Sequence, residues 1–132
     1  MKLTRRLALV AATVAAIVLG SAAAAHASSD IGWVTTTGTG GKAYFDADLA
    51  GVEGWESITV CDTYSDGGAA VVTLFDDTDW ALKGTFKDTV NDGSCTTYSG
   101  NYVTDEHYVS IQVCVVTSGT RSHCSQEVGG VS

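Results

Sequence analysis

The chain contains no proline, only one methionine and seven basic residues against fifteen acidic ones. Without proline, its tight turns must be made by glycine, asparagine, aspartate and serine. After the first 27 residues, no segment shows the apolar spacing of an amphipathic helix. The four cysteines lie 34, 19 and 10 residues apart, so there is no close Cys-x-x-Cys pair of the kind that holds structural zinc. These absences argue against a helical bundle and against a zinc-stabilised domain.

The first 27 residues have the three parts of a secretory signal peptide. Lys2, Arg5 and Arg6 form a positive head, an apolar stretch occupies residues 7–20, and Ala-His-Ala ends at Ala27. The apolar stretch is shorter than the roughly 20 residues that a membrane-spanning helix needs. We therefore expect cleavage after residue 27, by either Sec or twin-arginine export, and a single secreted domain over residues 28–132.

Loss of the leader makes the chain more acidic. It removes three of the seven basic residues and none of the fifteen acidic ones, so the net charge changes from −8 to −11. Nucleic acids and anionic membranes are bound through cationic side chains, which argues against both as partners. The charge favours solubility and leaves a cationic protein as a partner. We expect a monomer that needs no cofactor.

The part after the leader is typical of an all-β protein. Segments that alternate between apolar and polar residues are separated by Gly-rich or Asp-rich turns about every ten residues, as in a β-sandwich. We predict an immunoglobulin-like or related antiparallel sandwich of seven or eight strands. The strand candidates are residues 31–37, 43–49, 57–63, 70–75, 80–87, 95–98, 107–116 and 121–128. In the fifth, Trp80, Leu82, Gly84 and Phe86 are predicted to face the core.

All four cysteines follow the leader, and an even number in an exported chain indicates disulfides. In "CVVTSGTRSHC", Cys114 and Cys124 are symmetric about Gly119. A hairpin that turns at residues 118–120 would place them opposite one another. Cys61 then pairs with Cys95, which gives "VCDTYSDGG" a structural reading: Cys61 ends a strand, and Asp62 and Asp66 belong to the following turn.

Two groups of polar residues are candidates for a chemical site. Asp76, Asp77 and Asp79 crowd one turn in "FDDTDW", where Ca²⁺ would relieve their repulsion, but the sequence lacks a complete calcium-loop pattern. His107 and His123 lie on the last two strand candidates without a nucleophile motif, and are expected at the surface or at a sheet edge. Neither group predicts an enzyme.

Trp55 lies in a loop, "GVEGWE", where it either covers the end of the sandwich or is an exposed anchor for a protein or sugar partner. Counting strand crossings places this loop at the same end as the acidic turn, and loop 88–94 at the other end. Trp55 with Asp76, Asp77 and Asp79 is therefore our candidate for a surface that binds a cationic partner.

The order of "VCDTYSDGG", "NDGSC" and "VSIQVCVVTSGTRSHCS" resembles small secreted, disulfide-bonded β proteins of Streptomyces and related actinobacteria. The resemblance covers residues 56–125. Members of that group usually have an aromatic residue soon after the final Cys-Ser, whereas Gln126 and Glu127 follow here. No activity is established for the group, so the resemblance implies export, a β fold and disulfides, and it implies no site.

Taken together, the sequence favours a secreted, acidic, non-catalytic module that binds or inhibits a partner. The alternative is a structural or envelope-associated secreted protein without a discrete ligand.

Overall fold

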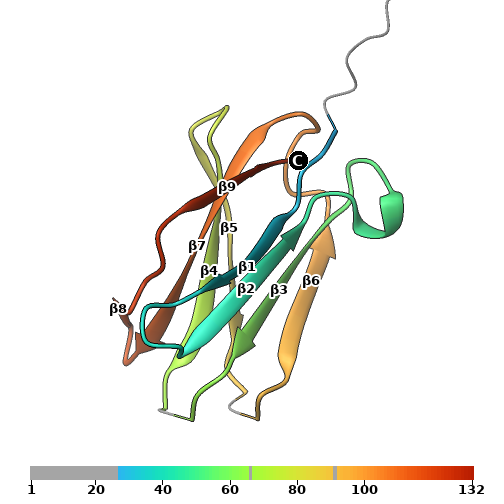
Figure 1. Cartoon of the computed structure of the whole chain (residues 1–132). Helices are drawn as coiled ribbons and strands as arrows, with labels where there is room; N and C mark the ends of the chain where they lie inside the picture. The colour runs from blue at the N-terminus through green and yellow to red at the C-terminus, as the bar shows by residue number, and fades with distance from the viewer. Residues whose placement is uncertain (1–26, 66, 91) are drawn as a thin grey trace, which may run out of the picture.

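The computed structural model describes residues 27–65, 67–90 and 92–132. Except for Ala27, the leader expected over residues 1–27 lies outside this range, as does Asp66. Within the described part, nine strands and one short 3-10 turn, η1 (Leu49–Gly51), form two antiparallel sheets packed face to face (Figure 1). The strands are β1 (Ile31–Thr35), β2 (Gly41–Asp46), β3 (Glu56–Asp62), β4 (Ala69–Asp76), β5 (Ala81–Asp88), β6 (Cys95–Gly100), β7 (Tyr108–Thr117), β8 (Thr120–Ser122) and β9 (Val128–Val131). The predicted β-sandwich is confirmed.

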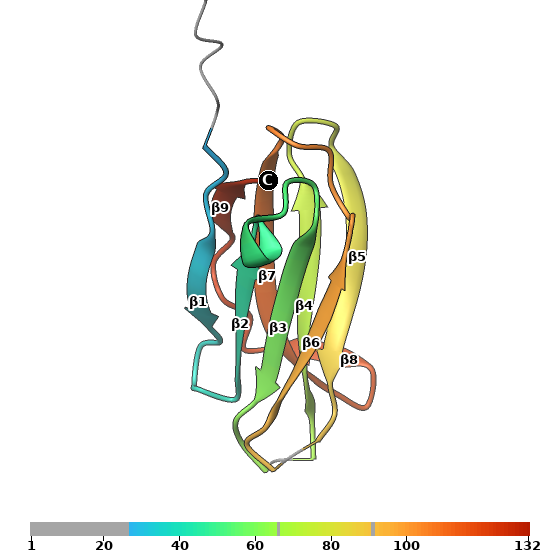
Figure 2. The same ribbon diagram turned by 90° about the vertical axis from the view of Figure 1, so that its right-hand side faces the viewer.

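One sheet has the order β1-β2-β3-β6 and the other the order β5-β4-β7-β8, with β9 also paired to β7. The chain changes sheet between β3 and β4, between β5 and β6, and again before β7, as Figure 2 shows from the side. Such exchanges are typical of the Greek-key connections in immunoglobulin-like sandwiches. They bring the β2–β3, β4–β5 and β6–β7 loops to one end of the molecule, which we call the upper end after its position in Figure 1.

Alternation along the strands produces the core. Each strand turns every second side chain toward the opposite sheet, so that β-branched and aromatic residues from both sheets meet between them. Phe86 closes one side of this core, with its ring 5.3 Å from that of Tyr98 and 5.0 Å from that of Tyr102. The buried apolar side chains include Phe45, Ile58, Val60, Val72, Leu74, Phe86, Val109, Ile111 and Val113.

The alternation predicted for β5 is wrong in its first half. Leu74 pairs with Gly84 but the next residue, Phe75, pairs with Leu82, so Lys83 is an extra residue in a β-bulge. Phe86 is buried as predicted, whereas Leu82 and Trp80 are exposed. A one-residue bulge exchanges the two faces of a strand, and the sequence pattern alone gives no sign of it.

Both predicted disulfides are present. Cys61 pairs directly with Cys95 across β3 and β6, and Cys114 within β7 is bonded to Cys124, which follows β8. Two disulfides indicate an oxidising environment. None of the described segments is a helix long and apolar enough to cross a membrane.

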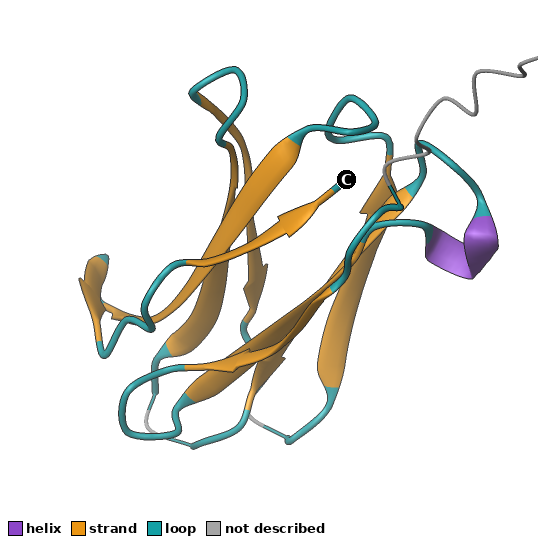
Figure 3. Ribbon diagram, turned by 45° about the horizontal axis from the view of Figure 1, so that its top comes forward, coloured by secondary structure: helices purple, strands orange, loops and turns teal. Residues whose placement is uncertain are grey.

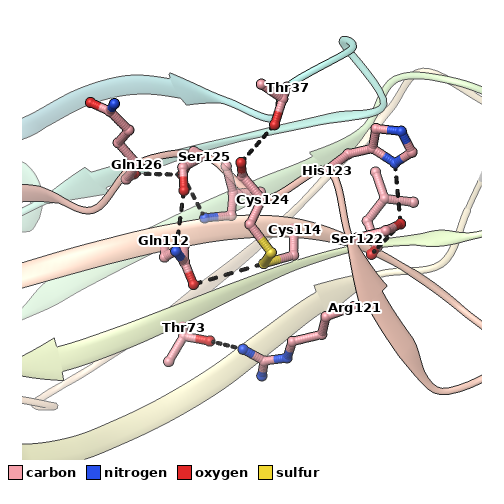
Figure 4. The surroundings of a disulfide bond; sticks show 12 residues. Thr37, Thr73, Gln112, Cys114, Arg121, Ser122, His123, Cys124, Ser125 and Gln126 are labelled. Carbon is pink, nitrogen blue, oxygen red and sulfur yellow. Dashed lines mark hydrogen bonds between the residues drawn. A yellow bond between two sulfur atoms is a disulfide. The ribbon is translucent and has the colours of Figure 1, made fainter.

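The final hairpin differs from its predicted register. Its turn has two residues, Ser118 and Gly119, both with positive φ, and Thr117 pairs with Thr120. His123, with a φ of 50°, is the extra residue that restores Cys124 to its position beside Cys114 (Figure 4). The strand predicted over residues 121–128 is therefore two strands, β8 and β9, separated by an irregular segment (Figure 3).

Candidate functional site

The upper end contains the acidic turn that joins β4 to β5. Asp76 ends β4 and is fully buried, and its Oδ1 accepts hydrogen bonds from the backbone N–H groups of Thr78 and Asp79, both at 3.0 Å. The turn is also tied to β7, because the N–H of Asp77 donates to the carbonyl of Tyr108 (2.8 Å) and the N–H of Tyr108 donates to the Thr78 hydroxyl (2.9 Å). The tip of the β4–β5 hairpin is therefore held by hydrogen bonds to Asp76 and to Tyr108.

Two nitrogen groups meet the other oxygen of Asp76. Lys83 Nζ lies 3.1 Å from Oδ2, and His107 Nδ1 lies 2.9 Å from the same atom. The bulge in β5 makes the first contact possible, since it turns Lys83 toward the interior side of the sheet. Burial alone would raise the pKa of Asp76, but the hydrogen bonds from His107, the Asp79 N–H and Lys83 outweigh burial and lower this pKa to about 2. Asp76 is thus a charged group that holds the turn together.

The cluster also contains the donor set of a metal site. Asp76, Asp79 and His107 each present one ligand atom, and these atoms lie within 4.8 Å of one another. However, the Lys83 ammonium already supplies positive charge at the Asp76 oxygen, 3.1 Å away. A Ca²⁺ ion also needs six to eight oxygen ligands. We therefore assign this cluster to closing the hairpin.

The predicted binding residues are only partly brought together. Asp76, Asp77 and Asp79 share one turn, but Asp76 is buried and Asp77 Oδ1 accepts a hydrogen bond from the Ser110 hydroxyl at 3.1 Å. Asp79 has a side chain that is 55% exposed. The β2–β3 loop, which contains Trp55, is at the same end of the molecule (Figure 1) and lies against the β6–β7 loop, where Gly54 is close to the Asp105 side chain.

The three tryptophans are all at the surface, although Trp80 was predicted to be buried. Trp55 is 46% exposed, Trp33 is 52% exposed and Trp80 is 82% exposed. Trp33 lies on the outer face of β1, with its ring centroid 5.6 Å from that of Tyr44 and 4.4 Å from Lys42 Nζ. Trp80, rather than Trp55, is therefore the aromatic residue that accompanies the acidic turn.

The histidines behave differently from one another. His123 is exposed, and its Nδ1 lies 3.1 Å from the hydroxyl of its neighbour Ser122 (Figure 4). His107 is partly buried, with its Nδ1 2.9 Å from Asp76 Oδ2, a contact that the sequence did not predict. Its role depends on the pairing of β4 with β7, a long-range contact that the sequence pattern does not reveal.

The whole chain was compared with protein-family models, with curated protein sequences and with solved structures, and none of the three comparisons found a match.

Proposed function

We propose that this protein is an exported, non-catalytic module that binds a partner through surface aromatic residues. The observation that carries this proposal is the exposure of Trp33, Trp55 and Trp80, which are all the tryptophans of the chain. Full burial of a large apolar side chain stabilises a domain by about 1.5–3 kcal/mol. About half of this contribution is absent for Trp33 and Trp55, and most of it is absent for Trp80. Tryptophan is also enriched among the residues that dominate protein interfaces.

The scaffold supports the same function. Small β domains bind through side chains on a rigid framework, and here two disulfides and a packed core hold the surface that carries the tryptophans. The histidine and carboxylate groups at the upper end contact one another and Lys83, so they serve to close a turn. The predicted leader supports export.

A retention experiment tests this function. The protein, produced with its leader in an exporting host, is immobilised and exposed both to culture fluid and to washed cell envelopes of the source organism. A matched variant replaces Trp33 and Trp55 with Ser and Trp80 with Asn, and its fold is checked by circular dichroism and by mass spectrometry of the disulfides. We expect saturable retention of a soluble component by the native protein, competed by free protein, and at least tenfold weaker retention by the variant.

Two results would contradict the proposal. Equal retention by the variant would show that the aromatic surface is not used. Binding only to the cell envelope, unchanged in the variant, would favour the structural alternative.

A further inference from the structure

The loops of the upper end carry a concentration of negative charge. They join β2 to β3, β4 to β5 and β6 to β7, and none of them contains lysine or arginine. Lys83 Nζ and His107 Nδ1 both contact Oδ2 of the buried Asp76, and His107 Nδ1 also lies 3.8 Å from Asp79 Oδ2. The exposed and partly exposed acidic residues in these loops and at their strand ends are Asp46, Asp48, Glu53, Asp77, Asp79, Asp105 and Glu106, whereas Glu56 and Asp76 are buried. We call this surface the acidic end.

The acidic end is hollowed beside the C-terminal residue. A depression of about 390 Å³ lies between the β2–β3 loop and the β6–β7 loop. Four acidic residues line it, Asp48, Glu53, Asp105 and Glu106, together with Ala27, Ser28, Gly51 and Ser132. The Ser28 hydroxyl donates a hydrogen bond to Asp48 Oδ2. Such a hollow suits the head of a long cationic side chain, which several carboxylates can surround.

Trp80 stands at the same end in an unfavourable conformation. Its φ is 55°, in the left-handed region that a bulky residue rarely adopts and that glycine occupies without strain. The turn around it is fixed by Asp76 and by Tyr108, so its backbone is not free to relax. A residue that is both strained and 82% exposed contributes little to stability. Backbone strain of this kind is concentrated at functional sites.

Other apolar side chains extend the surface below Trp80. Leu82, brought outward by the bulge, is 60% exposed, and Tyr108 at the start of β7 is 63% exposed. Both belong to the outer face of the β5-β4-β7 sheet at its upper end. The acidic end therefore combines an exposed aromatic and apolar edge with carboxylates that outnumber the basic side chains beside them.

We propose that the acidic end docks a cationic protein segment, with Trp80 as its anchor and the acidic depression as the receptor for an arginine or lysine side chain. This inference rests on the proposed function. It names the surface through which the proposed module binds and the class of partner that it binds. A second copy of the chain would bring two acidic ends together and would be repelled, whereas a basic segment is attracted by the same field. An arginine side chain can also stack on the Trp80 indole while its guanidinium meets Asp77 or Asp79.

The test uses a defined probe and site-resolved detection. A capped peptide in which arginine and leucine alternate is titrated into the isotope-labelled native protein, and amide and indole resonances are followed by NMR. The matched peptide carries glutamate in place of arginine. We expect saturable shifts at Trp80, Asp79 and Glu106 with the basic peptide only. Trp80→Asn, which preserves a left-handed backbone, should weaken binding about tenfold, and Glu53→Gln with Glu106→Gln should reduce its salt dependence.

Tyr64→Ala is the control, because Tyr64 is an exposed aromatic residue on the β3–β4 loop at the opposite end of the sandwich, and it should leave the affinity for the basic peptide unchanged. Shifts centred on Trp33 and Tyr44, equal binding of both peptides, or no saturable shift at the acidic end would each overturn the inference. A different result would contradict the inference while leaving the proposed function intact. If the native partner is lost in a Trp33 or Trp55 variant but kept in Trp80→Asn, the protein is a binding module that does not use this surface.

Discussion

Two buried aspartates mark opposite ends of the sandwich, and their surroundings differ. Asp76, at the upper end, contacts Lys83 and His107 in addition to two backbone N–H groups. Asp88, at the lower end, accepts hydrogen bonds only from neutral donors among its recorded partners: the N–H groups of Asp62 (3.0 Å) and Val90 (3.2 Å) and the hydroxyl of Thr96 (3.2 Å).

The different surroundings of the two aspartates reflect different ways of stabilising the two ends of the sandwich. At the lower end, the Cys61–Cys95 disulfide fixes β3 to β6 next to Asp88 and its partners, so the chain there needs no ion pair. At the upper end no disulfide is present among the described residues, and contacts of Asp76 with Lys83 on β5 and His107 on the β6–β7 loop fix the turn instead. The lower end is secured by a covalent bond, whereas the upper end depends on charge.

The largest expected effect comes from the lower end. Replacing Cys61 and Cys95 with Ala should lower the free energy of unfolding by nearly 4 kcal/mol, because the lost bond closes a loop of about 35 residues. Replacing Cys114 and Cys124, which close a loop of about 11 residues, should cost about 3 kcal/mol. Urea unfolding of both variants measures the two costs. If removal of Cys114–Cys124 costs more stability than removal of Cys61–Cys95, then Cys61–Cys95 is not the main bond that stabilises the lower end.

The next effect concerns charge at the upper end. Asp76→Asn should lower the free energy of unfolding by about 2–3 kcal/mol at pH 7, since it leaves Lys83 and His107 without their buried partner. The control is Asp79→Asn, whose more exposed carboxylate should contribute less than about 0.5 kcal/mol. Equal costs for the two variants would show that burial of Asp76 is unimportant.

The pH dependence of the stability of Asp76→Asn gives a second test of the role of charge at the upper end. The pKa of Asp76 is about 2 in the folded protein against 3.8 for the unperturbed group, so its charge stabilises the fold above about pH 4. This contribution, up to about 2 kcal/mol, is lost as the pH falls from 4 toward 2. The stability difference between the native protein and Asp76→Asn should therefore shrink over this range. A difference that stays constant down to pH 2 would contradict the ion pairs.

A smaller effect is expected from Asp88→Asn. The amide retains one acceptor oxygen but places an NH₂ group against donors that now contact the carboxylate, at a cost of about 1–2 kcal/mol. Chemical unfolding at pH 7 measures it against Asp76→Asn. A cost larger than that of Asp76→Asn would reverse the comparison between the two ends.

The smallest effect has the opposite sign. Trp80→Gly removes a strained left-handed conformation and an exposed indole, so it should raise the free energy of unfolding by a few tenths to about 1 kcal/mol. Thermal unfolding measures this change. A loss of stability would show that the indole packs against the hairpin, and would weaken its assignment as an anchor.

The sequence predicted what depends on local pattern. Alternation identified the sandwich and its main strands, and the symmetry of Cys114 and Cys124 about Gly119 gave the correct disulfides. Both main errors come from single inserted residues. Lys83 exchanges the faces of β5 and so exposes Trp80, and His123 shifts the final hairpin. Bulges of this kind are selected by tertiary contacts, such as the one between Lys83 and Asp76.

The candidate site was harder to predict than the fold. The acidic turn was found because its aspartates are adjacent in sequence, but nothing local connects it with His107, which is 31 residues from Asp76. Trp55 and Trp80 could not be distinguished as anchors without the register of β5. Whether either tryptophan meets a partner stays a prediction.

The bulge at Lys83 also affects how the protein behaves in concentrated solution. β5 is the outermost strand of its sheet, and an unpaired strand edge can template the addition of strands from other molecules. The bulge breaks the regular spacing of donors and acceptors along that edge, and Lys87 adds an exposed charge further along it. The protein can therefore display Trp80 and Leu82 beside an open edge while remaining poorly suited to form aggregates through it.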